Sequence, residues 1–264
     1  MKHIVCFGGG HSSALAAIET VRRYGRKDVI LLNHDISSKV EHKDIKRFKQ
    51  EVSDVLEIPI VYANADDYEN MTPCAVSVKN GMFNAGFQGT QICTNRLKTA
   101  PFMDYLKGMT GDYDIIYGFD MNEPHRIQRR AQMLFAQGGY KTDFPLAYWE
   151  RTTENTEDIG IKRPITYKIY KHANCEACLK AGKRQWYVVY CLRPDLYEEA
   201  IWAEEKIGYS ILKESFMKEL VSEFEEIKSK GICPNQKGSN AEFWARVNAT
   251  LPGQESFLPC DCAI

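Results

Sequence analysis

The residues whose types and spacing best suit chemistry form a glycine-rich turn near the N-terminus, Gly8-Gly9-Gly10-His11-Ser12-Ser13. The turn follows the apolar run Ile4–Phe7 directly. Glycine lets the backbone approach a ligand closely, and a helix that opens at the two serines would offer free N–H groups to an anion. The turn, together with Phe7, therefore predicts a phosphate site. On these residues alone, an ordinary strand-to-helix turn remains the alternative.

Two further polar groups could complete such a site. Asn33-His34-Asp35 follows the branched run 29–33 and suits recognition of a ribose or a base. Farther along, Pro124 predicts a helix start that places Arg126 and Arg130 on one face, and arginine suits bidentate binding of phosphate or sulfate. A solvated loop and a solvated helix face are the respective alternatives.

The cysteines indicate metal or redox chemistry. The chain has nine, including a C-x-x-C at Cys175 and Cys178 and a C-x-C at Cys260 and Cys262. Two thiolates on a C-x-x-C turn can reach one metal ion, and a set of four suits an iron–sulfur cluster or zinc. Single cysteines elsewhere are more typical of small buried side chains.

A basic and aromatic stretch lies near the start of the last third of the chain. Lys183 and Arg184 precede Trp186 and Tyr187, a combination that can pair with a phosphate and stack on a base. The same aromatic residues could equally belong to a helix that packs in the core.

The elements that must position these residues follow an α/β pattern. Strands and helices alternate up to about residue 150, which predicts a parallel sheet with right-handed crossovers and ligands at the carboxyl ends of its strands. We expect strands at 4–7, 29–33, 59–62 and 114–118, and helices at 12–24, 40–56, 93–106 and from 124. The later segments are predicted as an irregular loop over 63–92, connective chain over 151–174, helices over 194–208 and 210–230, and a loop-rich final thirty residues.

Composition narrows the class of protein. The chain has 264 residues, a net charge of −1 and 44% hydrophobic residues, which supports a large core and excludes a uniformly charged polyanion binder. No apolar run approaches the roughly 20 residues that span a bilayer, and the glycines end the first apolar run too early for a signal peptide. We therefore expect a cytoplasmic protein that does not enter a membrane, and we further expect a homo-oligomer.

Several segments, in this order, resemble one family. Residues 7–13 resemble the pyrophosphatase loop of the adenine-nucleotide α-hydrolase (PP-loop, HUP) superfamily, S-G-G-x-D-S, and residues 93–102 resemble the C-x-x-R-x-x-x-x-P segment of its PAPS reductase-like branch. Gly118 with Arg126, and later the C-x-x-C, match further motifs of that branch, which includes sulfonucleotide reductases and DNA-phosphorothioation sulfurtransferases. The match covers roughly residues 1–205. Gly8 and Ser12 replace the Ser and Asp of the loop.

The resemblance implies a HUP-type sheet domain over 1–150 and a smaller helical region over 151–264 that carries a cysteine cluster. It implies ATP or a related adenine nucleotide as ligand, with Mg²⁺ as its usual cation. The nucleotide site would combine Phe7, Gly8, Gly9, Gly10 and His11 with Asn33, His34, Asp35, Gly118 and Arg130. Ser12, Ser13, Lys98 and Arg126 would be the catalytic residues, the last two neutralising developing charge. The metal ligands would be Cys93, Cys175 and Cys178, completed by Cys260 and Cys262, by Cys191, or by sulfur at an open iron site.

The function that follows is adenylation of an acceptor and transfer of sulfur to it. The acceptor could be nucleic acid, and a separate protein could donate the sulfur. Reduction of a sulfonucleotide is the alternative reaction, although the chain lacks the E-C-G-L-H motif of the reductases. A nucleotide-binding protein without catalysis, or a purely structural protein, are the alternatives outside enzymes.

Overall fold

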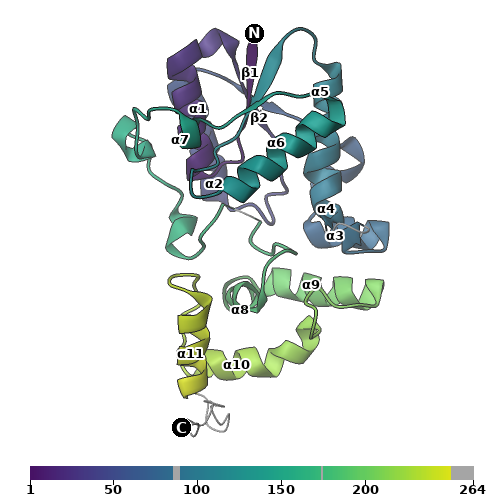
Figure 1. Ribbon diagram of the computed structural model, residues 1–264. Coiled ribbons are helices and arrows are strands. Elements are labelled where there is room, and N and C mark those ends of the chain that lie inside the picture. The colour runs from purple at the N-terminus through teal and green to yellow at the C-terminus, as the bar shows by residue number, and fades with distance from the viewer. Residues whose placement is uncertain (86–89, 174, 251–264) are drawn as a thin grey trace, which may run out of the picture.

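A computed structural model of the protein describes residues 1–85, 90–173 and 175–250 (Figure 1). Its centre is a parallel sheet with the strand order β3-β2-β1-β6-β7. The strands are β1 (Lys2–Cys6), β2 (Val29–Asn33), β3 (Ile60–Tyr62), β6 (Tyr113–Ile116) and β7 (Thr142–Asp143). The four strands predicted from the sequence are thus confirmed, and β7 is a short additional strand beside β6.

Alternating side chains of the strands enter two separate cores. Val5 on β1 packs among residues of α1 (His11–Tyr24), α2 (Lys43–Leu56) and α7 (Pro145–Tyr148), whereas its neighbour Ile4 packs with α5 (Ala100–Gly108) and α6 (Pro124–Gly138). Strands buried on both faces are typical of parallel sheets. The predicted α/β fold with helices on both faces is therefore confirmed.

The C-terminal part is helical, as predicted, and lies below the sheet in Figure 1. It contains α8 (Lys183–Leu192), α9 (Pro194–Ile207), α10 (Val221–Ser229) and α11 (Asn240–Thr250). These helices share one core around the fully buried Trp186, Tyr187 and Phe224. No helix of the described residues is long and apolar enough to cross a membrane.

The segment predicted as an irregular loop over 63–92 contains regular structure, so that prediction is wrong. It forms a 3₁₀ turn (Asp66–Tyr68), helix α3 (Pro73–Asn80) and the paired strands β4 (Asn84–Ala85) and β5 (Thr90–Gln91). The Thr72 hydroxyl caps α3 by accepting from the Ala75 N–H at 3.1 Å, Pro73 begins the helix, and Gly81 ends it in the left-handed conformation. These are ordinary helix-boundary signals.

Two other helix predictions differ from the structure. The helix expected over 210–230 begins only with a 3₁₀ turn at Met217. The buried Glu204 carboxylate accepts the N–H groups of Ile211 (2.7 Å) and Met217 (2.6 Å) and holds the chain between them as a loop.

The final thirty residues, predicted to be loop-rich, contain helix α11. The helix expected from residue 93 starts as α4 (Ile92–Thr94) and passes through a π-helical turn (Asn95–Thr99) into α5.

Candidate functional site

The site lies where the sheet changes direction. From β1 the chain builds β2 and β3 on one side and β6 and β7 on the other, so the crossovers after β1 and β6 leave a crevice at their carboxyl ends. A cavity of about 780 Å³ opens there. Gly8, Gly10, Ser12 and Ser13 line it from the turn after β1, and Gly118 follows β6. The predicted turn and the predicted glycine are therefore brought together.

Two glycines in this crevice are required by close packing. Gly9 has φ +75°, and a Cβ atom there would lie 2.9 Å from Ile45 and from the Lys49 side chain. A Cβ atom at Gly118 would lie 2.5 Å from the carbonyl oxygen of Ser12, which is backbone and cannot rotate away. Gly8 differs, because a Cβ atom there meets no atom within 4 Å. Gly8 therefore faces the open cavity.

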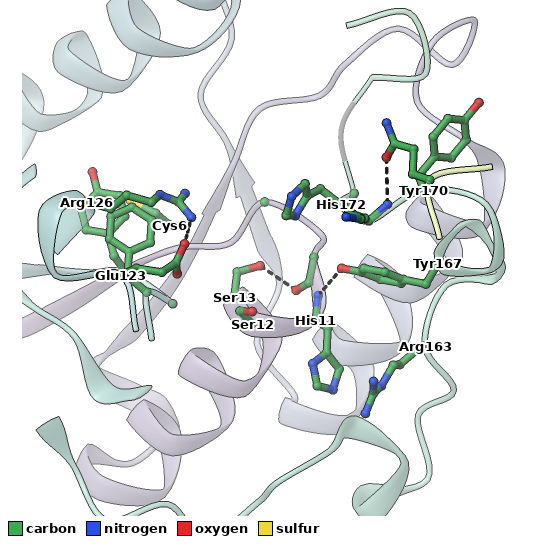
Figure 2. Close-up of a pocket in the computed structure, with 18 of the residues that line it drawn as sticks. Cys6, His11, Ser12, Ser13, Glu123, Arg126, Arg163, Tyr167, Tyr170 and His172 are labelled. Carbon is green, nitrogen blue, oxygen red and sulfur yellow. Dashed lines mark hydrogen bonds and ion pairs between the residues drawn. The ribbon is translucent and has the colours of Figure 1, made fainter. Parts of the chain in front are cut away.

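The first turn of α1 lies at the cavity, with His11, Ser12 and Ser13 close to Tyr167 (Figure 2). The His11 N–H donates to the Tyr167 hydroxyl at 3.0 Å, and the Ser13 hydroxyl donates to the Gly10 carbonyl at 2.8 Å. Within the described part of the chain, the N–H groups of Ser12 and Ser13 have no acceptor. Such a helix start attracts an anion.

The wall opposite α6 comes from the segment that the sequence indicated only as connective chain. In Figure 2, Arg163, Tyr167 and His172 lie on one side of the turn, and Glu123 with Arg126 lies on the other. Arg163 pairs with Glu157 at 3.2 Å. The cluster of basic and aromatic residues between 163 and 172 was the available signal for this wall, but only the tertiary fold places it beside the turn.

The larger cavity is electropositive. Its cationic lining residues are Arg126, Arg163, Lys171 and Lys237, whereas its one acidic lining residue, Glu123, already forms an ion pair with Arg126. A concave surface lined by one sign of charge concentrates ligands of the opposite sign. Burial, with a contribution from Arg163, lowers the pKa of His11, so its imidazole is neutral at pH 7.

A second cavity of about 120 Å³ adjoins the first, and both are lined by Cys6, Gly8 and Ala173. The predicted residues Phe7, Asn33, His34 and Lys98 line it. Asn33 is buried and has structural partners, since it donates to the Phe7 carbonyl and accepts from Lys49 at 3.2 Å. Burial raises the pKa of Cys6 to about 12, so this thiol stays protonated and is a poor nucleophile.

His34 and Lys98 are polar groups of the second cavity that a ligand could contact, and the position of the His34 ring is fixed by the backbone. Its Nδ1 lies 2.5 Å from the Ala63 carbonyl oxygen, which fixes Nδ1 as the protonated nitrogen and leaves Nε2 as an acceptor. Burial, assisted by Lys98 and Lys49, lowers its pKa to about 4. The ring is therefore neutral across the physiological range.

The lowered pKa of His34 predicts how the stability of the protein depends on pH. The unfolded chain protonates His34 near pH 6.5, whereas the folded chain does so only near pH 4, so the contribution of His34 to stability is lost as pH falls through this interval. We expect the free energy of unfolding to fall more steeply from pH 6.5 to pH 4 in the parent than in His34→Gln. Urea titrations at several pH values would measure this, and parallel curves for the two proteins would contradict it.

The other predicted site residues are distributed more widely. Asp35 is exposed, pairs with Lys46 at 2.7 Å and lines neither cavity. Arg126 lies 4.3 Å from the ring centre of Phe119, and Arg130 lies 5.2 Å from that of Tyr117. Arg130 lines a third cavity next to the first and not the first cavity itself.

The predicted metal ligands are only partly brought together. Cys93, Cys175 and Cys178 lie close enough that each of the last two raises the pKa of Cys93, which burial chiefly brings to about 11. Among residues 1–85, 90–173 and 175–250, however, no three His, Cys, Asp or Glu side chains form a group that could hold a metal ion. Cys260 and Cys262 lie outside the described residues. The metal centre therefore stays a prediction.

The basic and aromatic stretch of α8 does not form the nucleic-acid surface that its composition suggested. Trp186 is fully buried, and Lys183 pairs with Glu223 at 2.6 Å. Arg184 is buried and donates to the carbonyl groups of Asn235 (3.0 Å) and Ser239 (3.0 Å). Arg184 holds the loop before α11 against the helical core, so burial removes Arg184 and Trp186 from contact with a base or a phosphate, whereas Lys183 stays partly exposed.

Comparison with known proteins gives neither a family nor an activity for this chain. No protein-family model matches the chain. The chain is similar to the "Uncharacterized nin region protein ORF290" of Escherichia phage lambda, with 26% identity over 211 residues that make up 70% of this chain and 68% of the phage protein. The name of that protein states no activity, so the likeness gives this chain no function.

Proposed function

We propose that the protein is an adenine-nucleotide-binding enzyme that activates an acceptor by adenylation for sulfur transfer. The observation that carries the proposal is the pair of N–H groups of Ser12 and Ser13 at the start of α1, which have no acceptor among the residues that the structure describes. They open into an electropositive cavity at the switch point of a parallel sheet. This arrangement favours the phosphates of a nucleotide over a neutral ligand.

The two adjoining cavities fit the two halves of such a nucleotide. The larger one, with Arg126, Arg163 and the helix start, suits the phosphate chain. The smaller one is partly apolar, through Ile36 and Phe102, and offers the neutral Nε2 of His34 as an acceptor for an amino or hydroxyl group. Ligand sites commonly combine apolar walls with a few polar groups.

The proposed reaction has two steps. An acceptor oxygen attacks the α-phosphorus of ATP, the bond to the β-phosphate breaks, and pyrophosphate leaves with the electron pair. A sulfide-level sulfur then bonds to the activated acceptor atom as its bond to oxygen breaks, which releases AMP. Arg126 and Arg163 would stabilise the charge on the departing pyrophosphate.

Gly8 provides the sharpest test of nucleotide binding. Because a Cβ atom at Gly8 meets no protein atom, the side chain of Gly8→Val would enter the shared cavity space without disturbing the fold. We expect ATP affinity to fall by at least about tenfold, with an unchanged unfolding transition. Isothermal titration calorimetry and urea unfolding would measure both.

Gly108→Val is the matched control for this experiment. Gly108 is exposed at the end of α5, also has open space around it and lines none of the cavities described here, so ATP affinity should not change. Parental ATP affinity in Gly8→Val would contradict the proposed site. If the parent binds ATP but releases no pyrophosphate with candidate acceptors under anaerobic conditions, the catalytic part of the proposal fails and a binding protein remains.

A further inference from the structure

A third cavity, of about 470 Å³, lies next to the first and is lined by four cations. Arg126, Arg129 and Arg130 come from α6, and Lys180 comes from the chain before α8. The described lining residues include no Asp or Glu. Thr94, Asn95 and Thr99, from α4 and the π-helical turn, add hydroxyl and amide groups. The chemistry of this lining matches an oxyanion with several oxygen atoms.

Two of the four cations lie over aromatic rings, the other two, Arg129 and Lys180, are exposed, and the set is largely uncompensated. Arg126 and Arg130 each stack on an aromatic ring, of Phe119 and Tyr117 respectively. Among the described residues, Arg129, Arg130 and Lys180 form no ion pair, and the only such partner of Arg126 is Glu123. Arginines stacked on rings lose less freedom on binding, because their guanidinium planes are already oriented.

We infer that this third cavity binds a phosphate group of the acceptor, so that nucleotide and acceptor meet at Arg126. Phe119 and Arg126 line both the first and the third cavity. An acceptor phosphate held by Arg129, Arg130 and Lys180 would thus lie across one shared wall from the nucleotide. The identification of this ligand as the acceptor rests on the proposed function, but binding of phosphate at the cavity can be tested without any reaction.

The phosphate could belong to a nucleic-acid backbone or to a small phosphorylated molecule, and two probes separate these sources. Binding of a fluorescent oligothymidylate of eight nucleotides and of inorganic tripolyphosphate would be measured in the presence of saturating ATP. The affinities of the double variant Arg129→Ala/Lys180→Ala would be compared with those of the parent. The control variant is Lys206→Ala/Lys213→Ala, which removes the same charge from exposed positions that line none of these cavities.

We expect the cavity variant to bind at least one probe about tenfold or more weakly than the parent, while the control variant binds as the parent does. Because the oligonucleotide is single-stranded, the slope of the logarithm of affinity against the logarithm of salt concentration should become shallower by about 1.4, which is about 0.7 for each removed cation. Loss of oligonucleotide binding alone identifies a nucleic-acid backbone, and loss of tripolyphosphate binding alone identifies a small phosphorylated molecule.

Equal affinity of the cavity and control variants for both probes would overturn the inference, as would a parent that binds neither probe. ATP affinity, measured on the same samples without the probes, separates this failure from failure of the proposed function. Arg129 and Lys180 lie outside the two nucleotide cavities, so their replacement should leave ATP affinity within about twofold of the parent.

Discussion

Gly118→Val is expected to lower ATP affinity by more than about tenfold and to lower the free energy of unfolding by about 1–3 kcal/mol. The first atom of the new side chain would lie 2.5 Å from the Ser12 carbonyl oxygen, 2.7 Å from the Ser12 carbonyl carbon and 2.9 Å from the Ser13 nitrogen. All three are backbone atoms, so no side-chain rotation relieves the contact. The start of α1 must move away from β6, and the two free N–H groups move with it.

The three valine variants together separate packing from binding. Gly118→Val should lose both stability and ATP affinity, Gly8→Val should lose ATP affinity alone, and Gly108→Val should lose neither. Urea unfolding and calorimetric titration of the three proteins give the comparison. Gly118→Val with parental stability would show that α1 and β6 are not packed as closely as the structure indicates.

The sequence predicted the sheet well because the relevant signals are local. The apolar residues of strands β1, β2 and β6 form short runs buried in the sheet, and the glycines after β1 mark the turn into a helix. The helix from Pro124 followed from one residue at a helix boundary. Each of these inferences depended on neighbours within about ten residues.

The parts of the candidate site that the sequence did not predict depend on contacts between segments that are distant in the chain. Nothing local distinguishes Arg163 and Tyr167, which complete the cavity, from Lys183 and Arg184, which support the core. The first pair faces the turn because the chain after α7 crosses back over α1, and Arg184 is buried because the loop after α10 brings its carbonyl groups to it. Composition indicated basic and aromatic chemistry only at residues 183–187, whereas the basic and aromatic wall that a ligand can reach lies in the segment predicted as connective chain.

The second prediction with a large expected effect concerns the buried support of the glycine turn. Lys49 is 1% exposed, and its Nζ lies 2.8 Å from a carboxylate oxygen of Glu41 and 3.2 Å from Oδ1 of Asn33. Asn33 in turn donates to the carbonyl of Phe7, the residue before the turn, and the Lys49 stem packs against Gly9. One lysine therefore fixes the end of β2 and the turn after β1 at once.

Lys49→Met keeps the length of the side chain but leaves the Glu41 carboxylate without its closest partner, which should lower the free energy of unfolding by about 3 kcal/mol. We expect the low end of the range for broken buried pairs because Lys46 lies 3.9 Å from the same carboxylate. Glu41→Gln in the Lys49→Met background should recover part of the loss, since the uncompensated charge is then gone.

Lys46→Met is the matched control, because Lys46 belongs to the same helix, is about one-third exposed and pairs with the exposed Asp35. Its replacement should cost less than about 1 kcal/mol. Urea unfolding of the single and double variants would give the coupling energy between Lys49 and Glu41. If Lys49→Met costs no more than Lys46→Met, the turn is held by glycine packing alone, and the buried ion pair has no part in shaping the proposed nucleotide site.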